Sequence, residues 1–325
     1  MKKRLQELIK IPTDLLGLFQ SKRGSGKKYL SFKVRPDTLS RKYVDEPIIY
    51  LSRSSGKLLR VSNNDLVTIS FKNLRIPARV KIAGDRIIKP RHCQLNLLSV
   101  QALDIHPGNV INITPPESLV LLIDNSKSML GLLEDKQQKI RAAKEAVETL
   151  IENKITLNEN DFIGIVTFGQ NKMIVNLTSD LESPLYKIYK IQAAGSTYMY
   201  GGIKSAIKVL REGVGMKRII LVTDGVPSST GKEEILELVE KEAAGDIVID
   251  TVGVGNHRLA NDNIYSLNAY DEEFLETVSS LTGGQFTFVC DVEKFKKEFE
   301  KLAKAKRLFL PQKHMELEYD PPNRI

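Results

Sequence analysis

A short apolar run followed by oxygen-bearing side chains constrains this chain most. Residues 119–123 are five consecutive apolar residues, a pattern typical of a strand buried on both faces in a parallel sheet. Asp124, Ser126 and Ser128 follow at alternate positions, in a loop that leads towards a helix. Oxygen donors at the carboxyl end of a central strand are the ligands that a hard divalent cation needs. The run therefore predicts the middle of a sheet and a cation site at its edge.

Two later stretches supply donors of the same kind. The segment Ala-Gly-Ser-Thr197 opens a predicted helix, and the apolar run 219–222 predicts a second buried strand. That second run ends in Thr-Asp224-Gly. Because parallel strands end at the same edge of a sheet, we expect Asp224 to lie beside the residues that follow the first strand.

Strands and helices alternate from Ser118 onward, which predicts an α/β unit over residues 117–309. We expect a doubly wound, mostly parallel sheet of six strands, with residues 173–178 as an antiparallel edge strand. A long basic helix is expected over residues 292–308.

The spaced pattern Asp124-x-Ser126-x-Ser128, then Thr197, then Thr-Asp224-Gly, resembles the metal-ion-dependent adhesion site of von Willebrand factor A domains. The resemblance implies that Ser126 and Ser128 bind Mg²⁺ or Mn²⁺ directly, Thr197 directly or through water, and the two Asp mostly through water. It also implies an outward coordination position that accepts a carboxylate from a partner protein. Serines after a strand also cap helices, but the three segments together favour the metal site.

Five residues beside this pattern are candidates for a partner-binding rim. They are Asn125, Met129, Tyr198, Met199 and Gly225. For each of the apolar ones, a position in the core is the alternative.

The preceding segment, residues 29–116, has short β-rich runs separated by turn residues. Strands are expected at residues 29–34, 47–51, 66–71, 76–82, 86–89 and 110–113. Residues 59–69 also match residues 103–113, each copy indicating a helix end, a polar turn and a strand. This repeat resembles the double-psi β-barrel in the amino-terminal domains of AAA+ unfoldases, which recruits adaptors and substrates. Another six-stranded barrel is the alternative, and no Walker A sequence follows to supply an ATPase.

Charge divides the chain in the same place. Residues 1–116 carry 22 Lys and Arg against 8 Asp and Glu, whereas residues 117–325 carry 26 against 32. The net charges are therefore +14 and −6, which suggests two units with different partners. A basic half could bind nucleic acid or an acidic protein surface, or it could serve solubility and attraction between the two halves.

The ends of the chain carry no strong signal. Residues 1–28 are expected to form a short helical basic segment and linker, and residues 310–325 a C-terminal tail. Neither a secretory signal nor a membrane-spanning run is recognisable. Cys93 and Cys290 are expected to be free thiols in a reducing compartment, which favours a cytoplasmic location and gives no indication of zinc.

The sequence gives no evidence of a catalytic group. The four His are scattered, no Ser lies in a GxSxG elbow, and Lys127 is expected to point away from the site. We therefore expect no enzymatic activity. The predicted function is a metal-dependent scaffold or adaptor that binds a partner carboxylate through the metal, and an AAA+ machine or its client through the barrel. Nucleic-acid binding and Mg²⁺-dependent hydrolysis are the alternatives.

Overall fold

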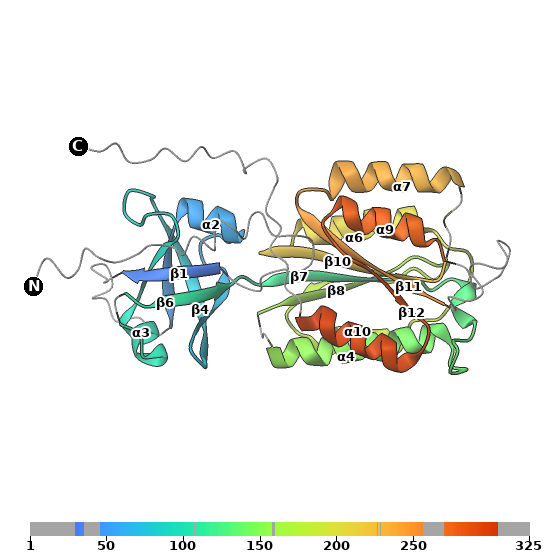
Figure 1. Cartoon of the computed structure of the whole chain (residues 1–325), viewed down its shortest axis with the longest axis horizontal. Helices are drawn as coiled ribbons and strands as arrows, with labels where there is room; N and C mark the ends of the chain where they lie inside the picture. Colours follow the sequence, from blue (N-terminus) through green and yellow to red (C-terminus); the bar gives the residue numbers. More distant parts are fainter. Residues whose placement is uncertain are drawn as a thin grey trace, which may run out of the picture.

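The computed structural model describes most of both predicted units. The described residues are 30–35, 46–106, 108–157, 160–225, 227, 229–255 and 270–304. The expected segments at residues 1–28 and 310–325 therefore lie outside the described residues. Figure 1 shows the β-rich unit on the left and the α/β unit on the right.

Six strands of the first unit form a closed barrel in the order β1-β5-β2-β4-β3-β6. They are β1 (Leu30–Arg35), β2 (Ile48–Ser52), β3 (Leu66–Phe71), β4 (Leu74–Ala83), β5 (His92–Leu95) and β6 (Val110–Thr114). β1 pairs in parallel with β5, and β2 with β4, whereas the other neighbours are antiparallel. Alternate apolar side chains fill the interior, for example Val67 and Ile69 in β3.

The internal repeat appears as two similar helix-and-turn segments. Helix α2 (Arg53–Leu59) is capped by Ser52, and helix α3 (Leu97–Leu103) is capped by Asn96. Each helix ends at a residue in the left-handed region, Arg60 with φ 56° and Asp104 with φ 51°. A polar turn and a strand follow each helix, as the repeat predicts.

The expected strand at residues 86–89 is wrong. These residues form a turn, in which the backbone N–H groups of Ile87 and Ile88 both bond to the carbonyl of Gly84. The sixth strand of the barrel is β5 instead, which pairs with β1 and β2 and which the sequence did not indicate. Pro90, which has no N–H to give a ladder, separates the turn from this strand.

The second unit has the expected α/β fold around a six-stranded sheet. Its strands are β7 (Glu117–Ile123), β8 (Phe162–Thr167), β9 (Ile174–Thr178), β10 (Met216–Thr223), β11 (Ile247–Val254) and β12 (Phe286–Val289). Their order is β12-β11-β10-β7-β8-β9, and all neighbours are parallel except β9, the antiparallel edge strand. All seven residues of β7 are buried, which explains why its sequence is an unbroken apolar run.

Helices cover both faces of this sheet (Figure 1). The core on one face includes α4 (Lys139–Leu157), α5 (Glu182–Ile188) and α10 (Val292–Lys304). The core on the other face includes α6 (Met199–Arg211), α7 (Ser229–Glu242) and α9 (Glu272–Leu281). The expected helix at residues 292–308 is described as far as Lys304. No helix among the described residues has the length and apolar character needed to cross a bilayer.

The two units meet at the amino ends of β7 and β10. Arg60 of the barrel contacts the turn before β11, where its Nη1 lies 2.9 Å from Asp246 Oδ1 and its Nη2 donates to the carbonyl of Gly245. The carbonyl of Arg60 accepts a hydrogen bond from Gly215 N. Burial lowers the pKa of Arg60, and the charge of Asp246 opposes that effect.

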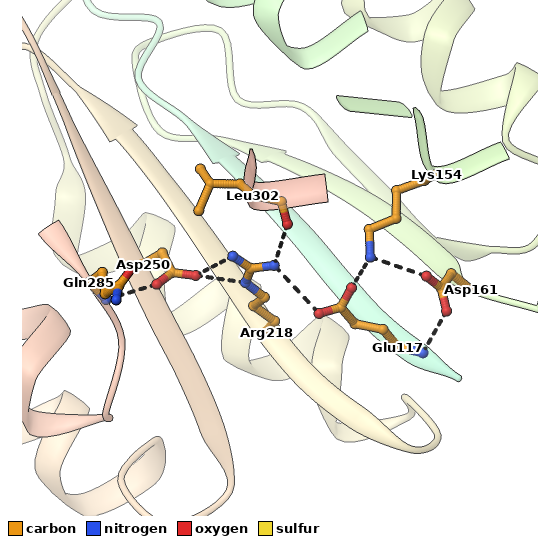
Figure 2. Close-up of polar contacts among 7 residues, drawn as sticks. All are labelled: Glu117, Lys154, Asp161, Arg218, Asp250, Gln285 and Leu302. Carbon is orange, nitrogen blue, oxygen red and sulfur yellow. Dashed lines mark hydrogen bonds and ion pairs between the residues drawn. The ribbon is translucent and has the colours of Figure 1, made fainter. Parts of the chain in front are cut away.

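A buried ionic network lies at this same end of the sheet (Figure 2). The Arg218 guanidinium bonds Asp250 through Nε at 2.6 Å and the carbonyl of Leu302 through Nη1 at 2.8 Å. Its Nη1 also lies 3.6 Å from Glu117 Oε1. Glu117 is paired in turn with Lys154, whose Nζ is 3.1 Å from Asp161 Oδ2. Burial alone lowers the pKa of Lys154, but Glu117 and Asp161 outweigh it and raise that pKa.

Candidate metal centre

The predicted donors come together where β7 and β10 end. The two strands are neighbours, with Ile123 opposite Val222, and Asp124 N bonds to the carbonyl of Val222 at 2.8 Å. β7 begins beside the barrel and runs away from it (Figure 1). The ends of β7 and β10 that carry the donors therefore lie far from the place where the two units meet. Asp124 and Asp224 directly follow the two strands and are 0% and 2% exposed. Parallel pairing thus places two carboxylates in one buried location.

Asp124 is held by two hydrogen bonds. Its Oδ1 accepts from Ser126 N at 2.8 Å, and its Oδ2 accepts from Thr223 Oγ1 at 2.6 Å. Thr223 Oγ1 also accepts a bond from Gly225 N at 2.9 Å. Thr223 thus positions Asp124 and Gly225 together, a role that the sequence analysis missed although Thr223 stands within the Thr-Asp-Gly motif.

The hydroxyl donors continue this arrangement. Ser126 precedes the 3₁₀ turn η2 (Lys127–Leu130), and its Oγ lies 2.9 Å from Ser128 Oγ. Ser128 Oγ donates to Asp224 Oδ1 at 2.7 Å. Ser128 is half-buried, so the cluster reaches the surface on this side.

Thr197 approaches from a third segment, the loop before α6. A Cβ added at Gly225 would lie 3.0 Å from Thr197 Oγ1 and 3.3 Å from Asp124 Oδ2. Both oxygens therefore border the small space over Gly225, where a larger residue would crowd them. Lys127 N bonds to the carbonyl of Gly195 at 2.9 Å and ties this loop to η2.

The donor set fits a hard cation. Within the described parts of the chain, no group of three or more His, Cys, Asp or Glu could hold a metal ion. The oxygens here are two carboxylates and three hydroxyls, brought together from three segments, and oxygen ligands of this kind suit Mg²⁺ or Mn²⁺.

A lysine that sequence analysis did not select completes the site. Lys139, the first residue of α4, is 0% exposed, and its Nζ donates to Asp224 Oδ2 at 2.8 Å. At the start of an amphipathic helix such a residue looks like a solvent-facing one, so no sequence signal distinguishes it. The pair adds a positive charge beside the two carboxylates.

Most of the expected rim is not at the surface. Met129 and Met199 are 0% and 2% exposed, and each belongs to one of the two hydrophobic clusters of the α/β unit. Gly225 is also buried. Asn125 is 1% exposed because its amide is used inside the protein: Nδ2 donates to the carbonyl of Asn171, and Oδ1 accepts from Gly169 N.

Only Tyr198, of the five expected rim residues, is largely exposed, at 66%. Two exposed apolar residues near the site were not among the predicted rim residues. Leu130 in η2 and Leu132 just after it are 42% and 52% exposed.

Burial dominates the electrostatics of Asp124. Loss of solvation is the main effect that raises its pKa, the charge of Asp224 also raises it, and the hydrogen bonds from Thr223 and Ser126 lower it. The net result is a rise of the pKa from 3.8 to about 6. A buried carboxylate that resists ionisation is stabilised by any cation placed beside it.

We expect Mg²⁺ affinity to depend on pH. Below the Asp124 pKa of about 6, a proton must leave before the cation binds, so the affinity should fall by about tenfold per pH unit. Above that pKa the affinity should level off. Calorimetric titrations at pH values on both sides of 6 measure this; an affinity that does not change across that range would contradict the prediction.

Comparison with known proteins identifies the fold of the second unit. Residues 119–226 match the family model of the von Willebrand factor type A domain. The α/β unit therefore has the fold of this domain type, in agreement with the resemblance that the motif indicates.

The similar proteins are distant. A Borreliella burgdorferi protein described as uncharacterized is 26% identical over 216 residues, 61% of this chain and 61% of that protein. The 26S proteasome regulatory subunit rpn10 of Schizosaccharomyces pombe is 24% identical over 143 residues, 43% of this chain and 58% of that subunit. The chain thus spans about three fifths of the length of both relatives. Among solved structures, the SpRpn10 VWA domain is 19% identical with a TM-score of 0.45, covering 56% of this chain and 93% of that domain.

Proposed function

We propose that this protein is a non-enzymatic adaptor that binds a partner's carboxylate through Mg²⁺ or Mn²⁺. One observation carries the proposal: Asp124, Ser126, Ser128, Thr197 and Asp224 bring their oxygens to one partly accessible place from three segments of the chain. These residues would hold the cation, which would offer a positive coordination position to an acidic residue of the partner. Tyr198, Leu130 and Leu132 would contact the surface around that residue.

Hydrolysis is less well supported than binding. A magnesium site can polarise a phosphoryl or carbonyl oxygen, but hydrolysis also needs a group that activates water. His92 and His106 lie in the barrel, and the other two His lie outside the described residues. No described histidine adjoins the site. Lys139 is engaged with Asp224, and Lys127 is exposed.

The barrel is proposed to bind the second partner. It has two parallel strand pairs in a closed six-stranded barrel and two copies of a helix, turn and strand. These features support a double-psi barrel, and by that analogy we propose an AAA+ machine or its client as the second partner. Leu97 on α3 is 62% exposed and offers an apolar contact.

Intramolecular contacts weaken the nucleic-acid alternative. Arg60 binds the turn at Asp246, and Arg79 is paired with Glu46 at 2.8 Å. Two of the basic residues that gave the barrel its charge are therefore engaged within the chain.

The test is capture of partners by immobilised full-length chain in Mg²⁺ and in EDTA. Ser126→Ala should lose the same partners that EDTA removes, because the hydroxyl ligand is missing. Leu97→Ser, with an intact metal site, should keep those partners and lose a different set. Capture that ignores both EDTA and Ser126→Ala but falls steeply with salt would support nucleic-acid binding and reject the proposal.

A further inference from the structure

The ammonium group of Lys139 is built into the candidate metal centre. Its backbone N–H bonds to the carbonyl of Gly131 at 2.9 Å, and a bridge between Leu132 and Gln138 closes the loop between them. This loop fixes the start of α4 under η2. The side chain is 0% exposed and reaches Asp224 Oδ2, whereas the other oxygen of Asp224, Oδ1, accepts the bond from Ser128.

The two oxygens of Asp224 therefore have different roles. Oδ2 is turned to Lys139, and Oδ1 is turned to the hydroxyl donors. Lys139 thus decides which oxygen of Asp224 faces the cation position, and it also adds a fixed charge within the same buried region.

The charges do not balance with a divalent cation alone. Asp124 and Asp224 contribute −2 and Lys139 contributes +1, so the chain supplies −1. A divalent cation changes the sum to +1, an excess that is unfavourable in a buried region of low dielectric constant. One carboxylate from outside the chain returns the sum to zero.

We propose that Lys139 is a built-in second cation that weakens metal binding by the chain alone and couples it to the partner's carboxylate. The inference rests on the proposed function and goes beyond it: metal and acidic partner bind cooperatively, each favouring the other. By reciprocity, the factor by which carboxylate tightens metal binding equals the factor by which metal tightens carboxylate binding.

A purely structural ion pair predicts a different result. Removal of Lys139 would then change stability and leave metal affinity as it was. The charge argument predicts instead that removal of Lys139 strengthens metal binding, because the cation would then neutralise both carboxylates by itself. Metal affinity therefore separates the two explanations, whereas stability does not.

The experiment is calorimetry of the full-length chain with Mg²⁺ and with Mn²⁺, each with and without acetate as a carboxylate probe. Lys139→Met removes the charge with little change of volume, and Lys139→Arg keeps the charge. Lys139→Met should bind Mg²⁺ at least about tenfold more tightly than the wild type. Acetate should tighten binding by the wild type and by Lys139→Arg, and should have little effect on Lys139→Met.

A second neutral variant and a second measurement show whether a change in metal affinity comes from loss of folding. Lys139→Gln retains a donor for Asp224 and should behave as Lys139→Met does. The rise of Tm on adding Mg²⁺ should also be larger in the two neutral variants than in the wild type. Equal Mg²⁺ affinity in wild type and neutral variants overturns the inference and leaves the proposed function standing. No Mg²⁺ binding by any variant, with or without acetate, overturns the proposed function and the inference together.

Discussion

Replacement of Arg218 by Met is expected to lower the free energy of unfolding by about 3–5 kcal/mol. Arg218 is 2% exposed and lies between Asp250 and Glu117, which are 1% and 0% exposed (Figure 2). Without the guanidinium, both Asp250 and Glu117 would lose a buried counter-charge. A methionine fills similar volume, so the loss reports the uncompensated charge rather than a cavity.

The geometry also predicts that lysine can replace Arg218 only in part. The guanidinium uses Nε and Nη2 on Asp250 and Nη1 on the carbonyl of Leu302. A single ammonium cannot reach these positions together, so Arg218→Lys should recover only part of the stability.

Arg211→Met is the matched control for the Arg218 variant. Arg211 pairs with Glu242 at 2.7 Å, but its side chain is 67% exposed. Its loss should change stability by less than about 1 kcal/mol, because solvent already screens the pair. The chain has no tryptophan, so urea unfolding is followed by circular dichroism. Similar losses for both variants would show that the network adds no more than a surface ion pair.

Asp124→Asn is expected to abolish Mg²⁺ binding and, in EDTA, to make the protein more stable at neutral pH. The Asp124 pKa is raised from 3.8 in the unfolded chain to about 6 in the folded one. The neutral Asp124 carboxyl therefore makes its full contribution to stability below the unfolded-state pKa. That contribution is lost as the pH rises through the folded-state pKa. With about 1.4 kcal/mol per pKa unit, the ionised carboxylate destabilises the metal-free protein by about 1–3 kcal/mol above that pH.

The same substitution at Asp250 should have the opposite sign. Asp250 is as deeply buried as Asp124, but it accepts bonds from Arg218 and from Gln285 N. Asp250→Asn leaves the guanidinium without its main counter-charge, so stability should fall. Urea unfolding of both variants in EDTA, below and above pH 6, measures the contrast. A loss of stability in Asp124→Asn at neutral pH would mean that Asp124 is not strained by its charge.

Several features of the molecule could be predicted from residue order alone. The unbroken apolar runs at β7 and β10 indicated strands covered on both faces, and the sheet has that form. The polar residues after those runs marked the carboxyl edge, because parallel strands place their ends together. Both signals are local patterns repeated along the chain, so no knowledge of the sheet order was needed.

The residues around the metal site and the position of strand β5 in the barrel could not be predicted in this way. A methionine can lie in the core or in an exposed binding surface, so its residue type does not distinguish the two. Packing places Met129 and Met199 in the core. The run Ile87-Ile88 has a strand-like composition, yet Gly84 and Asp85 start a turn there.

Only the tertiary structure decided the partners of the charges. Lys139 meets Asp224, 85 residues further on, because α4 follows β7 in the chain and Asp224 follows the neighbouring strand β10. Arg218 meets Asp250 because β10 and β11 lie side by side. Periodicity shows that a residue lies in a helix or strand, whereas a buried charge takes its counter-charge from whichever element the sheet order brings beside it. The sequence by itself therefore determined the fold class and the edge where the donors gather, and the tertiary structure determined the charge that the site carries.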